Sequence, residues 1–312
     1  MPDAPLPVPD ALRYEVLRRS PEAGARWLND LPSRCARLCR RWGLRIDGPP
    51  AHGAAAIVVP VAGPGGRYAL KLISPWTDAA AERAALEAFA GDGAARLLDA
   101  DEDAAALLIE WLPGPPLITE PDRVAAMRIA GELAGRLGRT PAPAGTRTLA
   151  AGAADWRQEL MAQHAAAEAA GEAFSDELLA LALDAVDELA TDRTRTLTHG
   201  DLSLDNILAA GPGRWVAIDP LLLIGTVAHD VHTIARSQLG AVITDPDPAG
   251  RLDALTREVT RAAGVDHGWA QRLSLARYVA SAYWEAQHDG EAANVHRLRA
   301  AVLITARLVG RA

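Results

Sequence analysis

A single lysine, Lys71, stands in the middle of an apolar run and limits what this part of the chain can become. The other 31 of the 32 basic residues are arginine, so positions that need only positive charge use arginine throughout. The run from Tyr68 to Ile73 predicts a β-strand, and a lysine inside a buried strand is costly unless an anion meets it. Arginine would replace it poorly, because its broad planar fork fills a different site. Taken alone, the pattern fits a strand lysine that faces an anion and a surface lysine kept by chance equally well.

A second constraint is the segment 198–206, which reads Thr-His-Gly-Asp-Leu-Ser-Leu-Asp-Asn. Asn206 follows Asp201 by five positions, the spacing of the kinase catalytic loop. One carboxylate can then reach an acceptor hydroxyl while the amide turns back toward a metal on the phosphates. Asp219 follows the apolar run 215–218, so we expect it at a strand end as a further oxygen ligand for Mg²⁺. The loop segment or Asp219 alone would be typical of a turn. Lys71, the loop and Asp219 in this order together indicate ATP and Mg²⁺ as cofactors.

The bulk properties exclude several classes of partner. A net charge of −8 and a pI near 5.5 argue against nucleic acid or an anionic membrane. No apolar run reaches the roughly 18 residues of a membrane span, and the N-terminus lacks the features of a secretory signal. Cys35 and Cys39 lie four apart in a predicted helix, where a disulfide is poorly placed. We expect a cytoplasmic protein with reduced thiols, a monomer by default, in which His229 and His232 are helix residues rather than a metal pair.

The hydrophobic pattern divides the chain into three parts. Residues 1–43 are expected to be a helical segment, 44–115 a β-rich lobe, and 116–312 a mainly helical lobe that carries the segment 196–220. The expected helices are 10–42, from 77 or 78 to 89, 122–137, 154–170, 176–190 and further helices after 228. The expected strands are 54–61, 68–73, 97–98 and 107–111, with a hairpin turn at 63–66, and loops are expected at 141–145 and 244–250.

Further motifs along most of the chain carry a family resemblance. They are Trp42-Gly43-Leu44 with the segment 47–53, Leu70-Lys71-Leu72, the segment 93–98, His199-Gly200-Asp201-Leu202, Asn206-Ile207-Leu208, the segment 217–220, and Ala282-Tyr283-Trp284 near Asp289-Gly290. With them the chain resembles the aminoglycoside phosphotransferase family, most closely its streptomycin 6-kinase and aminoglycoside/hydroxyurea resistance kinase branch. The resemblance implies an α/β (α+β), bilobal, protein-kinase-like fold with a small β-rich N-lobe, a larger helical C-lobe and ATP between them.

On the nucleotide side, the resemblance assigns roles by motif. Lys71 would contact the α/β-phosphates, and a helix glutamate would orient it: Glu82, with Glu87 as the competing candidate. Glu110-Trp111-Leu112 would be the hinge, where backbone groups would meet adenine. The chain departs from the kinase pattern in having no G-x-G-x-x-G, so a nucleotide-covering loop can use only Gly48, His52, Gly53 and Ala54.

On the acceptor side, Asp201 is the candidate base or hydroxyl-positioning group, and Asn206 and Asp219 would hold Mg²⁺. The place of His199 implies a loop-ordering role. Candidate acceptor-binding residues are Ser203, Asp230, Trp284, Glu285 and Asp289. Ser203 stands where relatives often have histidine, which leaves the choice of acceptor open, and Asp230 is alternatively an anchor of the catalytic loop.

These roles imply a small-molecule O-kinase whose acceptor is an aminoglycoside-like or hydroxyurea-type antibiotic. Residues 116–312 contain 25 acidic and 19 basic residues, a balance that suits a cationic acceptor and equally suits ordinary solubility. Two alternatives stay open: a metabolic kinase of the same fold acting on a sugar, amino sugar or amino alcohol, and a nucleotide-binding pseudokinase. The intact Lys71, Asp201, Asn206 and Asp219 argue against the pseudokinase.

Overall fold

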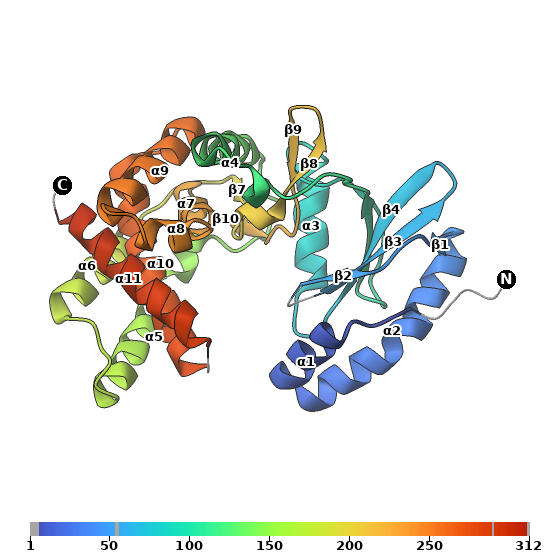
Figure 1. Cartoon of the computed structure of the whole chain (residues 1–312), viewed down its shortest axis with the longest axis horizontal. Helices are drawn as coiled ribbons and strands as arrows, with labels where there is room; N and C mark the ends of the chain where they lie inside the picture. The colour runs from blue at the N-terminus through green and yellow to red at the C-terminus, as the bar shows by residue number, and fades with distance from the viewer. Residues whose placement is uncertain (1–5, 54–55, 289, 311–312) are drawn as a thin grey trace. The chain divides into compact units, whose positions relative to one another are not determined.

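The computed structural model describes residues 6–53, 56–288 and 290–310, which form two compact units (Figure 1). The first unit ends at Pro113 and the second begins at Gly114, within two residues of the boundary expected from the sequence. The first unit is a sheet with helices and the second is mainly helical. No helix among the described residues is both long enough and apolar enough to cross a bilayer.

In the described part of the first unit, one antiparallel sheet carries Lys71 at its centre. Its strands are β1 (Arg45–Ile46), β2 (Ala51–His52), β3 (Ala56–Gly63), β4 (Gly66–Ile73), β5 (Leu97–Asp101) and β6 (Ala106–Glu110). The order is β1-β3-β4-β6-β5, with β2 also paired to β3, and the expected hairpin joins β3 to β4. Lys71 pairs with Val58 on one side and Leu107 on the other, so β4 is an interior strand.

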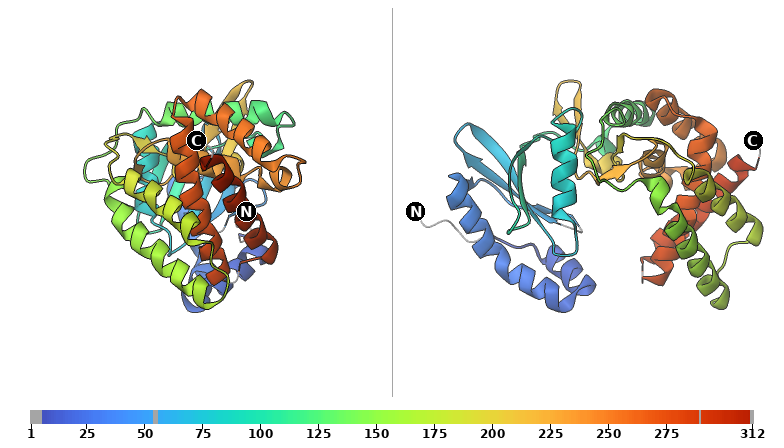
Figure 2. Two further views of the ribbon diagram at one scale, coloured as in Figure 1. Left: turned by 90° about the vertical axis from the view of Figure 1, so that its left-hand side faces the viewer. Right: turned by 180° about the vertical axis from the view of Figure 1, so that it is seen from behind.

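The three helices of this unit cover both faces of the sheet, as Figures 1 and 2 show. They are α1 (Asp10–Arg19), α2 (Pro21–Trp42) and α3 (Ala79–Phe89). The prediction of one helix over 10–42 is wrong at Ser20, because Pro21 has no N–H to continue α1 and instead opens α2. Leu70 and Leu72 share one hydrophobic core with the apolar stripe of α2. Since strand side chains alternate, Lys71 is on the opposite face, toward α3.

The second unit is built from helices around two small β-pairs. Its elements are η1 (Leu117–Thr119), α4 (Arg123–Leu137), α5 (Leu149–Ala169), α6 (Asp176–Leu189), β7 (Leu197–Thr198), η2 (Leu204–Asn206), β8 (Ile207–Gly211), β9 (Arg214–Ala217), β10 (Leu223–Ile224), α7 (Ala228–Arg236), α8 (Leu239–Ile243), α9 (Pro248–Ala263), α10 (His267–Gln287) and α11 (Ala292–Val309). Buried side chains of α5, α6, α10 and α11 form a shared core that includes Tyr278 and Tyr283.

One predicted loop of this unit is shorter than expected. The loop predicted over 244–250 ends at Asp247, because Pro248 is the first residue of α9. The Asp247 carboxylate accepts a hydrogen bond from the N–H of Gly250 and so caps the helix. Proline is well tolerated at this first position, where its missing N–H has no helical partner to lose.

Candidate active site

Lys71 and Glu82 form a buried ion pair in the first unit. The Lys71 Nζ donates a hydrogen bond to Glu82 Oε1 at 2.6 Å, and the side chains are only 6% and 8% exposed. Asp78 caps α3 by accepting from the N–H of Ala81, which begins the helix one turn before Glu82. The predicted pairing is therefore confirmed, and Lys71 meets the anion that a buried lysine requires.

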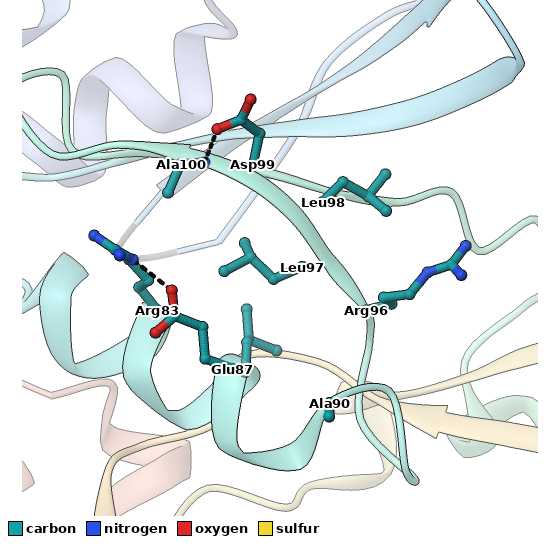
Figure 3. Close-up of a pocket in the computed structure, with 9 residues that line it drawn as sticks. Arg83, Glu87, Ala90, Arg96, Leu97, Leu98, Asp99 and Ala100 are labelled. Atoms are coloured by element: carbon teal, nitrogen blue, oxygen red, sulfur yellow. Dashed lines mark hydrogen bonds and ion pairs between the residues drawn. The ribbon is translucent and has the colours of Figure 1, made fainter. Parts of the chain in front are cut away.

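The competing glutamate has a different partner. Glu87 accepts a hydrogen bond from the Nε of Arg83 at 2.7 Å on the more exposed face of α3. Arg83 and Glu87 also line a hollow of about 530 Å³ between α3 and β5 (Figure 3). Its other lining residues come from the end of α3 and the segment 96–100, so this hollow includes neither Lys71 nor Glu82.

The remaining nucleotide-side residues lie at strand ends of the sheet. Glu110 ends β6, and its Oε1 accepts a hydrogen bond from the N–H of Arg96 at 2.9 Å. Leu112 follows, half-buried. His52 is exposed at the end of β2, and the Gly53 N–H donates to Ala56 O at 3.1 Å. Ala54 lies outside the described residues, and contact of His52 and Gly53 with nucleotide stays a prediction.

The catalytic-loop motif of the second unit forms a compact turn after β7. The Asn206 Nδ2 donates to the backbone O of Asp201 at 2.9 Å, and a longer contact of 3.4 Å reaches Asp201 Oδ2. The Asp201 side chain is exposed, as a group that meets a substrate must be. Ser203 caps η2, its Oγ accepting from the N–H of Asn206 at 3.3 Å. That cap occupies the hydroxyl of Ser203 within the loop itself.

Asn206 and Asp219 are brought to the same end of the β8–β9 hairpin. Ile207 pairs with Ala217, and just beyond this pair the N–H of Ile218 donates to Asn206 O at 2.9 Å. Because Nδ2 of Asn206 is engaged by Asp201, its amide oxygen points away from that bond. An amide oxygen and a carboxylate suit Mg²⁺, which takes few protein ligands and keeps water. Asp219 has φ of +61°, a left-handed conformation that aspartate tolerates better than most residues.

Asp230, at the start of α7, anchors the catalytic loop. Its carboxylate accepts from Thr198 Oγ1 at 2.7 Å, from the His199 N–H at 2.9 Å and from the Gly200 N–H at 2.7 Å. Burial alone would raise the pKa of Asp230, but His229 and His199 beside it and the Thr198 hydroxyl bring it below its ordinary value. The side chain is fully buried, which favours the anchoring role over contact with an acceptor.

His199 orders the loop from within. Its Nε2 lies 3.0 Å from Ile218 O and its Nδ1 accepts from the Asp201 N–H at 3.3 Å, which fits a neutral ring protonated on Nε2. Burial lowers the pKa of His199, although the negative fields of Asp230, Asp201 and Asp219 oppose the change. A neutral, doubly bonded ring is suited to holding the turn rather than to shuttling a proton.

Two adjoining hollows between α5 and α10 form a groove in the second unit. Their volumes are about 290 and 420 Å³, and both are lined by Trp156, Glu159, Ala280 and Ser281. The smaller one also contains Trp284 and Glu285, two of the predicted acceptor residues. The larger one reaches Leu223, whose side chain lies against Gly200 immediately before Asp201. Asp230 and Ser203 do not line this groove, and Asp289 lies outside the described residues.

Sequence reasoning missed the α5 side of this groove and Arg277. Trp156 and Glu159 lie on α5, more than a hundred residues from Trp284, and their three-residue helical spacing was the only local signal. Arg277 on α10 donates to His229 O at 2.6 Å, and burial lowers its pKa to about 10. The position of Arg277 beside His229 depends on the packing of α10 against α7, which no local sequence motif predicts.

Charge in the groove is partly paired. Arg147 donates to Asp155 at 2.5 Å, and Arg236 lies 3.7 Å from Glu285. Within the described part of the chain, Glu159 has no cationic partner and accepts only a hydrogen bond from Gln163 at 3.3 Å. The groove, which Trp156 and Trp284 also line, thus offers one carboxylate that is not already neutralised by an arginine.

Comparison with known proteins places the chain among small-molecule kinases. Residues 41–290 match the family model "Aminoglycoside/hydroxyurea antibiotic resistance kinase". A streptomycin 6-kinase of Streptomyces griseus is 33% identical over 289 residues, covering 91% of this chain and 92% of its own. A hydroxyurea phosphotransferase of Kitasatospora aureofaciens is 35% identical over 312 residues, covering 98% of this chain and 86% of its own.

Solved structures share the fold at much lower identity. A choline/ethanolamine kinase family protein of Mesorhizobium loti aligns with a TM-score of 0.57 at 15% identity, over 86% of this chain and 94% of its own. A spectinomycin phosphotransferase, solved with ADP and spectinomycin, aligns with a TM-score of 0.53 at 12% identity, over 88% and 97%. The protein-kinase-like fold expected from the motifs is thereby confirmed.

The buried histidines predict a loss of stability in mild acid. Burial lowers the pKa of His199, of His229 to about 4, and of His232. In the unfolded chain such histidines are protonated near pH 6.5, whereas in the folded chain they stay neutral to lower pH. Their contribution to the free energy of unfolding is therefore complete above pH 6.5 and is lost as the pH falls below it. Each adds a slope of up to about 1.4 kcal/mol per pH unit. Urea unfolding at pH 7.5, 6.5 and 5.5 checks this, and a flat profile would contradict it.

The ion pair predicts unequal effects for two glutamates of α3. Glu82→Gln removes the carboxylate that holds Lys71, and a charge-assisted hydrogen bond is worth about 1.5–3 kcal/mol. We expect kcat/KM for ATP to fall roughly ten- to a hundredfold. Glu87→Gln is the matched control and should leave it unchanged, because Glu87 pairs with Arg83. Steady-state ATP kinetics distinguish the two, and equal losses in both variants would remove the special role of Glu82.

Proposed function

The chain belongs to the aminoglycoside/hydroxyurea antibiotic resistance kinase family, and on that premise we propose that it transfers the γ-phosphoryl group of ATP to a hydroxyl of a small-molecule antibiotic. The acceptor we propose is aminoglycoside-like, of the streptomycin type, or of the hydroxyurea type. The observation that carries the proposal is the catalytic loop: an exposed Asp201 with Asn206 hydrogen-bonded to it, and Asp230 fixing the backbone before it.

In the proposed reaction the acceptor oxygen forms a bond to the γ-phosphorus while the bond to the β-phosphate oxygen breaks and ADP leaves. Asp201 positions the attacking hydroxyl and accepts its proton. Lys71, held by Glu82, would contact the α/β-phosphates, and the oxygens of Asn206 and Asp219 would hold Mg²⁺. The metal, when bound, neutralises charge on the phosphates. Positioning and charge neutralisation then account for most of the rate enhancement.

Because the proposed reaction consumes ATP, the proposed location of the protein is the cytoplasm.

The groove between α5 and α10 is the proposed acceptor site. It leads to Leu223 beside the catalytic loop, and its lining includes Glu159, Trp156 and Trp284. A carboxylate beside aromatic faces suits an amine or guanidinium group. Added phosphate would give such a drug about two negative charges, which would oppose its binding to RNA and so confer resistance.

The same groove favours one alternative. A carboxylate with aromatic neighbours also suits an amino alcohol or amino sugar, so a metabolic acceptor of that kind is the second candidate. The two candidates share all the phosphoryl-transfer residues and differ only in what fills the groove.

The proposed chemistry predicts product formation that depends on Asp201. Mass spectrometry of Mg-ATP reactions with streptomycin, other aminoglycosides, hydroxyurea, simple sugars and amino alcohols should detect phosphoryl addition to one of the antibiotics. Asp201→Asn should reduce the rate about 10²–10⁴-fold, the range for loss of a general base. Asp205→Asn, an exposed aspartate of the same loop, is the matched control and should stay active. Product only with a sugar or amino alcohol selects the alternative, and no product with any acceptor contradicts both.

The groove predicts a substitution that acts on the acceptor alone. Glu159→Gln should raise KM for a cationic acceptor about two- to fivefold, as expected for a solvent-exposed charge pair, and should leave KM for ATP unchanged. Asp184→Asn, an exposed acid of α6 that does not line the groove, is the control. The measurement is initial rate against acceptor concentration with ATP saturating. An unchanged acceptor KM would place the acceptor elsewhere.

A further inference from the structure

Three side chains that take no part in the proposed reaction converge where α5 meets α6. His164 and Glu168 lie one turn apart on α5, and Asp176 is the first residue of α6. The His164 Nε2 is 3.8 Å from Glu168 Oε1 and 3.7 Å from Asp176 Oδ1. The three atoms lie within 4.8 Å of one another. Figures 1 and 2 show the two helices side by side in the second unit.

The imidazole is buried and points an unused nitrogen at the two carboxylates. His164 is 4% exposed, and its Nε2 is a buried atom with no hydrogen-bond partner within the described residues. The carboxylates are 58% and 91% exposed, and both are too far away to accept a hydrogen bond from it. A buried polar nitrogen without a partner carries a desolvation cost, so its presence requires a reason.

The other ring nitrogen has a defined partner. The His164 Nδ1 lies 2.7 Å from the hydroxyl of Tyr283, and that oxygen also accepts from the Phe174 N–H at 3.2 Å. If Nδ1 carries the proton and donates it to Tyr283, the lone pair of Nε2 faces the carboxylates. Metal-binding histidines are usually oriented in this way, by a hydrogen bond from the ring nitrogen that does not bind the metal.

We propose that His164, Glu168 and Asp176 form a binding site for a divalent transition-metal ion, with zinc as the best-fitting ion. Zinc binds imidazole nitrogen and carboxylate oxygen at about 2.0–2.2 Å, and tetrahedral ligands at that length are roughly 3.4 Å apart. The two distances from His164 Nε2, 3.7 and 3.8 Å, are close to that spacing, and the carboxylate oxygens lie within 4.8 Å of each other on exposed side chains that can rotate toward an ion. One nitrogen with two oxygens favours zinc over Mg²⁺, which prefers oxygen ligands alone.

The nearby cation is held away from the ligand set. The Arg299 guanidinium lies over the ring of Phe174, 4.5 Å from its centroid, and donates to Glu172 O at 2.8 Å. Two carboxylates and a neutral imidazole leave an exposed fourth position for water. A bound ion would tie α5 to the start of α6 and, through Tyr283, to α10, so it would stabilise the folded helical unit. The site shares no residue with the proposed Mg²⁺ ligands Asn206 and Asp219.

Calorimetric titration of the chelator-treated protein with ZnCl₂, and with MgCl₂ alongside, tests the site. The wild-type protein should bind one zinc ion per chain, and its melting temperature in thermal unfolding should rise when zinc is added. Glu168→Gln and Asp176→Asn should each weaken zinc binding about tenfold or more, since each removes a ligand. Both side chains are exposed, so the variants should fold. Glu172→Gln, an exposed acid between the two helices that is no part of the set, is the matched control and should bind like wild type.

Three results would overturn the proposal. They are no zinc binding by wild type at micromolar concentration, binding undiminished in both ligand variants, and Mg²⁺ binding with equal affinity. Substitution with Co²⁺ adds a readout independent of stability, because its visible absorption reports direct nitrogen and oxygen ligation. The absorption band should be lost in Glu168→Gln and Asp176→Asn and kept in Glu172→Gln.

Discussion

The carboxylate of Asp230 is the interaction on which the catalytic segment depends. One side chain from α7 accepts from the hydroxyl of Thr198 and from two successive backbone N–H groups, those of His199 and Gly200. Without it, these buried backbone donors would each carry an unmet desolvation cost. With it, the chain turns at Gly200, whose φ of +86° only glycine adopts readily, and Asp201 emerges into solvent. The exposed Asp201, the proposed base, is therefore positioned by a buried carboxylate.

In the first unit, too, a buried carboxylate positions a candidate functional side chain, here through a single ion pair. Lys71 and Glu82 are almost fully buried, and such a pair rarely adds stability over an apolar pair of the same shape. Its retention is better explained by a need for a fixed positive charge on the α3 face of the sheet. The buried ion pair does not disrupt the hydrophobic core, because side chains alternate along β4 and Leu70 and Leu72 fill the core on the other face.

The parts that sequence predicted well are those whose physics is local. The strand lysine was predicted from the local pattern, the family resemblance assigned it Glu82 with Glu87 as the competing partner, and a four-residue gap predicted the turn from Asp201 to Asn206. Asp230 was predicted in two roles, and its burial together with its hydrogen bonds to the loop favours the anchoring one. Glu159 and Arg277 were missed because their neighbours come from helices far apart in the chain. The helix break at Ser20 and the start of α9 were misjudged where proline opens a helix instead of ending one.

The proposed separation of anchoring from recognition would allow the acceptor to vary while the chemistry stays the same. Ser203, which follows Asp201 by two residues, accepts the N–H of Asn206 at its hydroxyl and so caps η2, which ties this side chain to the loop. The residues proposed to distinguish acceptors lie on the facing surfaces of α5 and α10, chiefly Glu159, Trp156 and Trp284. Helix surfaces tolerate substitution far better than a loop held by three buried hydrogen bonds. Changes of acceptor would then arise in the groove, with the phosphoryl-transfer residues unaltered.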